Sequence, residues 1–147
     1  MDNVFYYDTT VTWKDGRIGE LTEPTMNAIT VATPPEFPKG VPSIWSPEHL
    51  FVASVNVCLM TTFLAIAENS KLEFDSYTAD AKGKLEKVDG KFMISEIELS
   101  PKIVVKEEKD IERTERIIQK AENACLISNS IKTKTFLKPE IKLADKN

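Results

Sequence analysis

Apolar and polar side chains alternate with a period of two over the first part of the chain, which predicts three short antiparallel strands. The first is expected over residues 4–13, where aromatic and aliphatic side chains alternate with polar ones. Asp15-Gly16 favours a two-residue hairpin turn after it. Two further strands are expected over 18–21 and 27–32, which completes a meander.

The pattern then changes from strand to helix. Residues 33–46 are rich in proline and predict a stiff connection across the surface. Ser46 has the side chain of a helix cap, and Pro47 suits the first helical position. From there to Glu68 apolar residues occupy nearly every face, so we expect a long buried helix.

The second half predicts a hairpin, a helix and a last strand. Residues 74–88 alternate, Asp89-Gly90 favours a turn, and 93–105 form a long strand in which Pro101 marks a break or an edge. A second helix is expected after Asp110. Its buried seam has helical spacing and consists of Ile111, Thr114, Ile118, Ala121 and Cys125. A final strand is expected over 133–143.

This order predicts an α+β fold with antiparallel sheets around a long buried central helix. The length of 147 residues favours one domain, 1–147. We divide it into a meander over 1–32, a connection over 33–46, and the two helices with their strands over 47–147.

Charge and hydropathy narrow the class of protein. The net charge of −4, a pI near 5.1 and the lack of a basic cluster argue against a nucleic-acid partner. Residues 50–67 carry no formal charge and come close to the length of a membrane span. Asn56 within that run and its acidic flanks favour a core helix instead. No signal peptide is evident, so we expect a cytoplasmic protein without a membrane partner.

The side chains that bind metals or activate nucleophiles are scarce. His49 is the one histidine and no Cys-x-x-Cys occurs, so we expect neither a metal nor another cofactor. A Cys-His nucleophile pair is disfavoured because His49 precedes Cys58 by nine residues, about 13 Å along a helix. We interpret His49 as a surface residue at the start of the helix.

Cys58 and Cys125 are the strongest remaining signal. Each falls on an apolar helix face, and each can be a small buried hydrophobe with no chemistry. Cys58 lies in mid-helix, where the helix dipole gives no help. If it is reactive, we expect a cation from elsewhere to favour its thiolate.

At this point the sequence resembles the OsmC/Ohr family, the osmotically inducible and organic hydroperoxide resistance proteins. Its pattern of Pro-Glu-x-Leu followed by Cys ten positions after the Glu is matched by Pro47, Glu48, Leu50 and Cys58. A second signature, Ala-x-x-x-Cys-x-x-Ser, is matched by Ala121, Cys125 and Ser128. The order of strands and helices is similar over essentially the whole chain.

The resemblance implies a thiol peroxidase that reduces organic hydroperoxides in oxidative stress defence. Cys58 would be the peroxidatic cysteine and Cys125 the resolving cysteine, and the two would form a disulfide. Glu48 would orient an arginine beside the thiolate. A dithiol, of the dihydrolipoyl type in the family's best-known branch, would reduce the enzyme again.

Three positions depart from the family pattern. Leu126 replaces the usual proline after the second cysteine, and His49 replaces an acid or amide. In the organic-peroxide branch of the family an arginine precedes an Asp-Gly turn, where this chain has Lys14, and Arg17 comes just after that turn. Arg17 and Lys14 are therefore both candidates for the activating cation, and we choose Arg17. The branch, OsmC or Ohr, stays open. A different class of function, a binding or structural relative with little turnover, stays open as well.

The resemblance combined with helix geometry predicts an intertwined homodimer. Glu48 and Cys58 are ten residues apart, about 15 Å along a straight helix and roughly 80° apart around it. One continuous helix cannot bring them to one reaction centre. We therefore expect Glu48 of one subunit to serve Cys58 of its partner.

Overall fold

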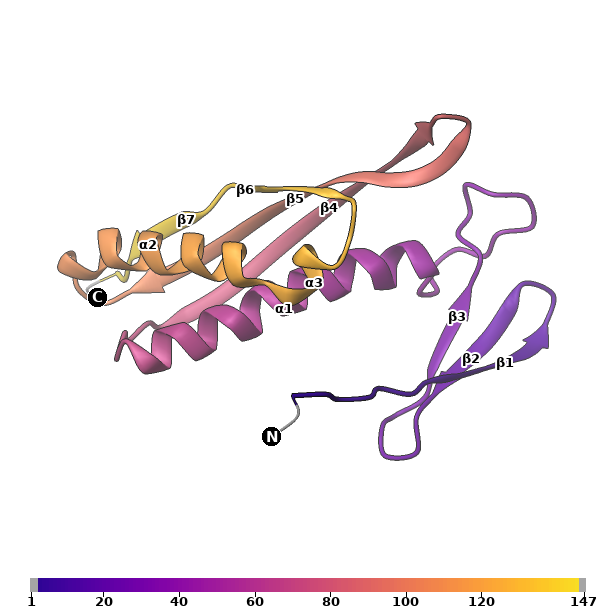
Figure 1. Ribbon diagram of the computed structural model, residues 1–147, viewed down its shortest axis with the longest axis horizontal. Coiled ribbons are helices and arrows are strands. Elements are labelled where there is room, and N and C mark those ends of the chain that lie inside the picture. The colour runs from indigo at the N-terminus through magenta and orange to yellow at the C-terminus, as the bar shows by residue number, and fades with distance from the viewer. Residues whose placement is uncertain (1–2, 146–147) are drawn as a thin grey trace. The chain divides into compact units, whose positions relative to one another are not determined.

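The structure is a computed structural model that describes residues 3–145, and it contains two compact units. The first extends to Leu50 and the second begins at Phe51. Figure 1 labels their helices and strands. The mixture of sheets and helices confirms the expected α+β class.

The first unit contains a three-stranded antiparallel sheet, β1-β2-β3, that leads into the first turn of α1. Its strands are β1 Thr10–Asp15, β2 Ile18–Thr22 and β3 Ile29–Ala32. The predicted turn lies between β1 and β2, and Gly16 adopts a φ of 52° there.

The first predicted strand, 4–13, is wrong over its first half, because residues 4–9 are not in a strand. The pairing of β1 with β2 ends at Thr10 opposite Thr22. A β2 extended beyond Thr22 would meet Pro24, which has no N–H to donate. Residues 4–9 therefore show the alternating apolar and polar side chains of a strand, but no strand in the described part of the chain pairs with them.

Helix α1 runs unbroken from Pro47 to Asn69, as predicted. The Ser46 hydroxyl oxygen accepts a hydrogen bond from the His49 N–H at 3.1 Å, which confirms the cap. His49 itself is exposed, as expected. Among residues 3–145, α1 is the one helix that is long and apolar enough to cross a membrane.

The second unit packs helices against a four-stranded sheet, and Figure 1 shows α1 and α2 on the same side of it. The strands are β4 Ser76–Val88, β5 Lys91–Val105, β6 Lys134–Leu137 and β7 Glu140–Leu143. The helices are the remainder of α1, α2 Lys109–Ala124 and the short α3 Leu126–Asn129. The core contains fully buried side chains from α1, β5 and α2, including Phe63, Leu99 and Ile118.

This sheet is mixed rather than purely antiparallel, because β6 and β7 both run parallel to β5. The expected last strand, 133–143, is accordingly two strands that pair with successive parts of β5. Pro101 does not break β5. It falls between the two pairings, after Leu99 and before Lys102, so its missing N–H removes no bond from either ladder.

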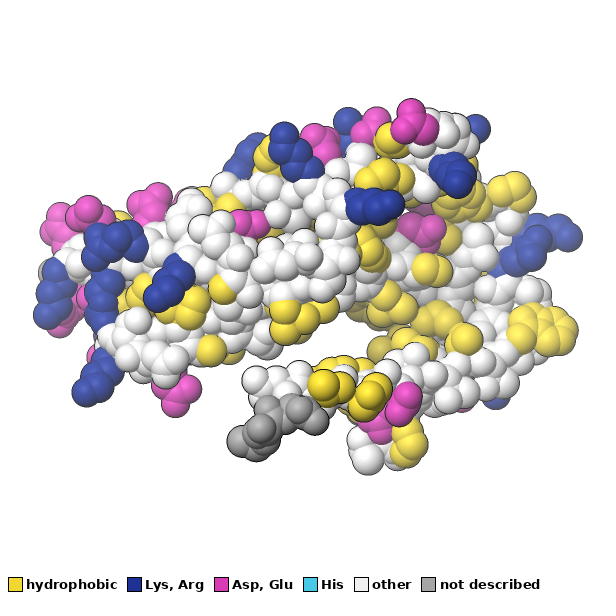
Figure 2. All heavy atoms as spheres, in the orientation of Figure 1, with side chains coloured by type: hydrophobic (Ala, Val, Ile, Leu, Met, Phe, Trp, Pro, Cys, Tyr) yellow, Lys and Arg dark blue, Asp and Glu magenta, His cyan; other side chains and the backbone are white. Residues whose placement is uncertain are grey.

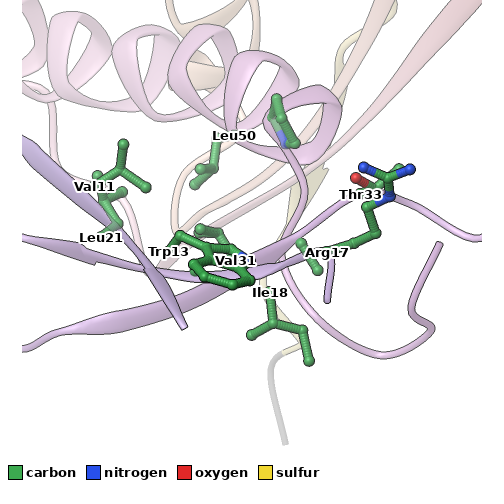
Figure 3. Close-up of a pocket in the computed structure, with 11 residues that line it drawn as sticks. Val11, Trp13, Arg17, Ile18, Leu21, Val31, Thr33 and Leu50 are labelled. Atoms are coloured by element: carbon green, nitrogen blue, oxygen red, sulfur yellow. The ribbon is translucent and has the colours of Figure 1, made fainter. Parts of the chain in front are cut away.

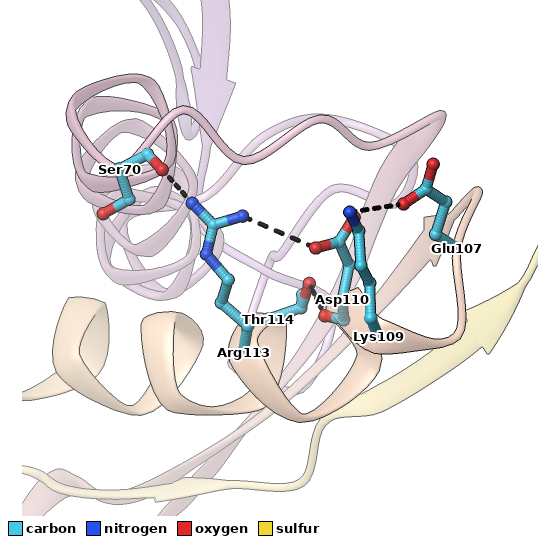
Figure 4. A network of polar contacts seen from close by, with 6 residues as sticks. All are labelled: Ser70, Glu107, Lys109, Asp110, Arg113 and Thr114. Carbon is cyan, nitrogen blue, oxygen red and sulfur yellow. Dashed lines mark hydrogen bonds and ion pairs between the residues drawn. The ribbon is translucent and has the colours of Figure 1, made fainter.

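A polar contact fixes α2 against the end of α1 (Figure 4). Arg113 of α2 donates a hydrogen bond to the carbonyl oxygen of Ser70 and pairs with Asp110 at 3.5 Å. The last turn of α1 carries no basic residue of its own, so Arg113 brings a cation to the carbonyl end of that helix. The predicted buried seam of α2 is confirmed at Thr114, Ile118 and Ala121.

Candidate functional site

The two cysteines lie together in the second unit, both as buried free thiols. Cys58 occupies the middle of α1. Cys125 follows α2 and caps α3, with φ −64° and ψ 113°. The end of α2 thus brings a thiol beside Cys58, and each cysteine changes the pKa of the other. The structure thus brings together the two cysteines that the sequence singled out, and the disulfide between them stays a prediction.

The local environment lowers the pKa of Cys58. Burial alone raises it, but this effect is outweighed by the Cys125 side chain, the Ile127 N–H, the Thr62 hydroxyl and the Leu126 N–H. Thr62 lies one turn further along α1, with its hydroxyl oxygen 3.9 Å from the Cys58 sulfur. The thiolate is thus favoured by hydrogen-bond donors at short range.

These donors correct the expectation that only a cation from elsewhere can favour the Cys58 thiolate. Leu126 and Ile127 open α3, and the first N–H groups of a helix have no acceptor within it. Sequence reasoning missed them because a backbone N–H carries no residue signature. The hydroxyl of Thr62, four residues after Cys58, is a signal that the sequence did contain.

The pKa of Cys125 is shifted in the opposite direction. Burial and the neighbouring Cys58 raise it, and the hydroxyl and N–H of Ser128 lower it only in part. Of the two thiols, Cys58 is therefore the one that more readily becomes a thiolate, the form in which a cysteine acts as a nucleophile.

The first unit holds the other two predicted residues, Arg17 and Glu48, in the lining of one cavity of about 420 Å³. Glu48 lies in the first turn of α1, and one of its carboxylate oxygens is buried without a hydrogen-bond partner in residues 3–145. Lys14 is not in the lining of this cavity; it pairs with Glu20 at 4.0 Å. The structure thus groups Arg17, rather than Lys14, with Glu48.

An apolar cavity of about 610 Å³ adjoins the same arginine in the first unit. Figure 3 shows Leu50 pointing from α1 toward the sheet residues Trp13 and Val31. The lining of this cavity is mostly hydrocarbon. Trp13, which contributes to it, is 74% exposed in the single chain. A cavity of this character suits an alkyl or aromatic group beside a cation.

Comparison with known proteins gives one family. The family model described as OsmC-like protein matches residues 40–140. A solved OsmC-like protein of unknown function from Vibrio cholerae is 25% identical, with a TM-score of 0.84 over 92% of this chain and 99% of that one. The uncharacterized protein YmaD of Bacillus subtilis is 25% identical over 95% of this chain and 93% of its own length.

A third relative carries a functional name. An organic hydroperoxide resistance protein from Elizabethkingia anophelis is 22% identical and covers 95% of this chain and 99% of its own, with a TM-score of 0.73. At this identity the similarity concerns the fold.

Proposed function

Because the chain belongs to the OsmC-like protein family, we propose that it is a thiol peroxidase that reduces organic hydroperoxides and protects against oxidative stress. The observation that carries the proposal is the cysteine pair. Two buried free thiols lie side by side, one with a lowered pKa and the other with a raised pKa. A structural cysteine needs no such arrangement.

The first step uses the Cys58 thiolate. It attacks the distal oxygen of the peroxide as the O–O bond breaks, the alkoxide takes a proton and leaves as an alcohol, and Cys58 becomes a sulfenic acid. Cys125 then attacks the Cys58 sulfur, which forms the disulfide and releases water. A dithiol reduces the disulfide by exchange and becomes oxidised itself.

Arg17 and Glu48 have the chemistry of a site for the peroxide. A guanidinium beside the peroxide oxygens would stabilise charge on the departing oxygen, and a carboxylate would orient it. The apolar cavity next to Arg17 favours a hydroperoxide with a hydrocarbon part over hydrogen peroxide.

We propose that these two residues serve Cys58 of a second copy of the chain. Because α1 is continuous, ten residues separate Glu48 from Cys58 by about 15 Å of helix rise. The helix also leaves apolar side chains uncovered, with Val57 53% and Leu64 39% exposed. A second copy that packs against this face would cover it and form a two-fold interface.

The remaining proposals concern compartment and partners. Two free thiols suit a reducing compartment, so we propose a cytoplasmic protein. Asn56 donates a hydrogen bond to the Ala79 carbonyl at 3.0 Å, which suits a helix packed in protein rather than lipid. The reductant is a dithiol, of the dihydrolipoyl type by resemblance. We propose no nucleic-acid partner, because the chain is acidic.

One observation favours the other class, a binding relative with little turnover. The buried oxygen of Glu48 makes no hydrogen bond within residues 3–145, so this oxygen does not orient Arg17 in the single chain. Multiple-turnover kinetics separate the two functions. With cumene hydroperoxide and dihydrolipoamide, a peroxidase consumes many equivalents of peroxide, and Cys58→Ser abolishes this. Consumption equal to that of the Cys58→Ser protein would overturn the proposal.

A further inference from the structure

Ser46 and His49 form a closed pair of hydrogen bonds at the start of α1. The Ser46 hydroxyl oxygen accepts the His49 backbone N–H at 3.1 Å and lies 2.6 Å from Nδ1 of the His49 ring. Ser46 is completely buried, so its hydroxyl proton needs an acceptor within the protein. Nδ1 supplies this acceptor, and the ring then carries its own proton on Nε2. His49 is thus exposed as a residue, but one of its ring nitrogens bonds a buried group.

This pair differs from the usual capping box of a helix. In a capping box the third helical residue is Glu or Gln, and its side chain bonds the backbone N–H of the capping residue. His49 occupies that third position here, and its ring bonds the serine hydroxyl instead. Each of the two residues therefore donates one hydrogen bond to the other and accepts one from it. The two bonds together hold the Ser46 side chain in its capping position.

The chain before the cap is tied to the end of β3. The Trp45 carbonyl accepts the Ala32 N–H at 2.9 Å, and the Trp45 ring meets the His49 ring edge to face with centroids 6.2 Å apart. Thr33, the residue after β3, donates its N–H to the Arg17 carbonyl at 3.4 Å. The end of β3 therefore connects the backbone of Arg17 to the start of α1 within the first unit.

Glu48 lies between the two members of this pair. One of its carboxylate oxygens is buried and makes no hydrogen bond within residues 3–145, so no bond of its own holds that oxygen in place. Pro47, which precedes Glu48, has no N–H with which to hold the turn. The position of the carboxylate therefore depends on the backbone of the first turn, which the hydrogen bonds between Ser46 and His49 hold.

We propose that Ser46 and His49 are positioning residues for Glu48. Their two hydrogen bonds hold the first turn of α1, so that the Glu48 carboxylate keeps its place in the cavity that Arg17 also lines. The His49 ring lies outside the lining of that cavity and acts through Ser46. The value of this positioning for a reaction rests on the proposed function, but the hydrogen bonds themselves do not.

The direct test is native-state hydrogen exchange, followed by NMR without peroxide. The N–H of residue 49 and that of Leu50 bond the hydroxyl and the carbonyl oxygen of Ser46, so their exchange reports the opening of the first turn. Ser46→Ala should speed their exchange about two- to thirtyfold, the range for loss of a helix cap. His49→Ala should speed it about two- to tenfold, the effect of one lost hydrogen bond.

Two further variants separate the hydrogen bond from the ring contact with Trp45. His49→Gln keeps an acceptor at the third helical position and should exchange at about the parental rate. His49→Phe keeps an aromatic ring beside Trp45 without an acceptor and should exchange as fast as His49→Ala. Parental exchange in both Ser46→Ala and His49→Ala overturns the proposal. Parental exchange in His49→Phe does so as well, because the ring contact would then hold the turn.

A second readout compares two reactions of Cys58. Stopped-flow oxidation by cumene hydroperoxide should slow about two- to tenfold in His49→Ala and His49→Phe, and should recover in His49→Gln. Alkylation of Cys58 by iodoacetamide needs no Glu48 and should keep the parental rate in all three variants. A general loss of structure would not single out the peroxide. Equal slowing of alkylation and oxidation therefore overturns the proposal.

A double variant tests whether the effect passes through Glu48. Glu48→Gln should slow oxidation by cumene hydroperoxide, and in that background His49→Ala should cause no further slowing, because the carboxylate it positions is gone. Additive slowing, or a Glu48→Gln protein as fast as the parent, overturns the proposal. If the parent itself does not react with the peroxide, the proposed function fails, while the exchange rates still decide whether Ser46 and His49 hold the first turn.

Discussion

The sulfur of Cys58 lies 3.9 Å from the hydroxyl oxygen of Thr62, one turn further along the same helix. This contact shows how a cysteine in mid-helix can be activated without the helix dipole. A hydroxyl at the fourth following position shares the face of the cysteine and donates to the thiolate. Together with N–H groups from α3, it offsets the burial that disfavours the charge.

Thr62→Val should raise the Cys58 pKa and slow its alkylation at neutral pH about two- to tenfold, because one hydrogen bond to the thiolate is lost. The thiolate is the reactive form, so the rate rises with pH and levels off above the Cys58 pKa; the variant should shift this midpoint to higher pH. Thr61→Val is the control, since its hydroxyl donates to the Cys58 carbonyl at 3.1 Å. Equal midpoints for the parent and Thr62→Val would show that the Thr62 hydroxyl does not stabilise the Cys58 thiolate.

Leu126→Pro should also raise the Cys58 pKa, because proline has no N–H to donate to the thiolate. The site tolerates the ring: Leu126 is the first residue of α3, its side chain is 66% exposed, and Cys125 before it is extended. Leu126→Ala keeps the N–H and should match the parent. Mass spectrometry of the alkylated Cys58 peptide gives the alkylation rate of Cys58 in the parent and in each variant. A Leu126→Ala variant as slow as Leu126→Pro would assign the effect to the side chain.

Arg17→Ala should slow the reaction with cumene hydroperoxide by about tenfold or more, because a charge-assisted contact to the peroxide is lost. Lys14→Ala should react like the parent, since Lys14 pairs with Glu20 outside the cavity of Arg17 and Glu48. Arg17→Lys should recover only part of the rate, because lysine lacks the planar fork. Stopped-flow measurement decides, and a slow Lys14→Ala with a normal Arg17→Ala would transfer the role to Lys14.

The shared site predicts complementation between inactive chains. Glu48→Ala and Cys58→Ser homodimers should both be inactive, whereas the heterodimer obtained by refolding them together should contain one site with both residues intact. Peroxide consumption per heterodimer should be about half that of the parent, because one of two sites is restored. A verified heterodimer without activity would mean that both residues act within one chain.

The sequence predicted best those elements whose signals are local. The cap at Ser46, the uninterrupted apolar run after Pro47 and the turns at Gly16 and Gly90 each depend on neighbouring residues, and α1 and both hairpins follow them. Residues 4–9 show the limit of this reasoning. Their alternation is that of a strand, but a strand needs a partner, and pairing with β2 stops at Thr22.

The candidate site was predictable in its side chains and not in its backbone. Cys58 and Cys125 could be paired from two local motifs. The groups that set the Cys58 pKa include N–H groups of Leu126 and Ile127, 68 and 69 residues further along the chain. Only the packing of α2 against α1 brings them to the sulfur. The parallel direction of β6 and β7 likewise depends on where the chain crosses after α3.

A single-turnover measurement is the sharpest test of whether Cys58 and Cys125 form a redox pair. The reduced protein is mixed with one equivalent of cumene hydroperoxide, free thiols are followed by stopped flow, and the product is digested without reductant for mass spectrometry. We expect rapid loss of two thiols per chain and a product in which the Cys58 and Cys125 peptides of one chain are joined by a disulfide. Slow, unselective loss of thiols, or disulfides found only between chains, would contradict it.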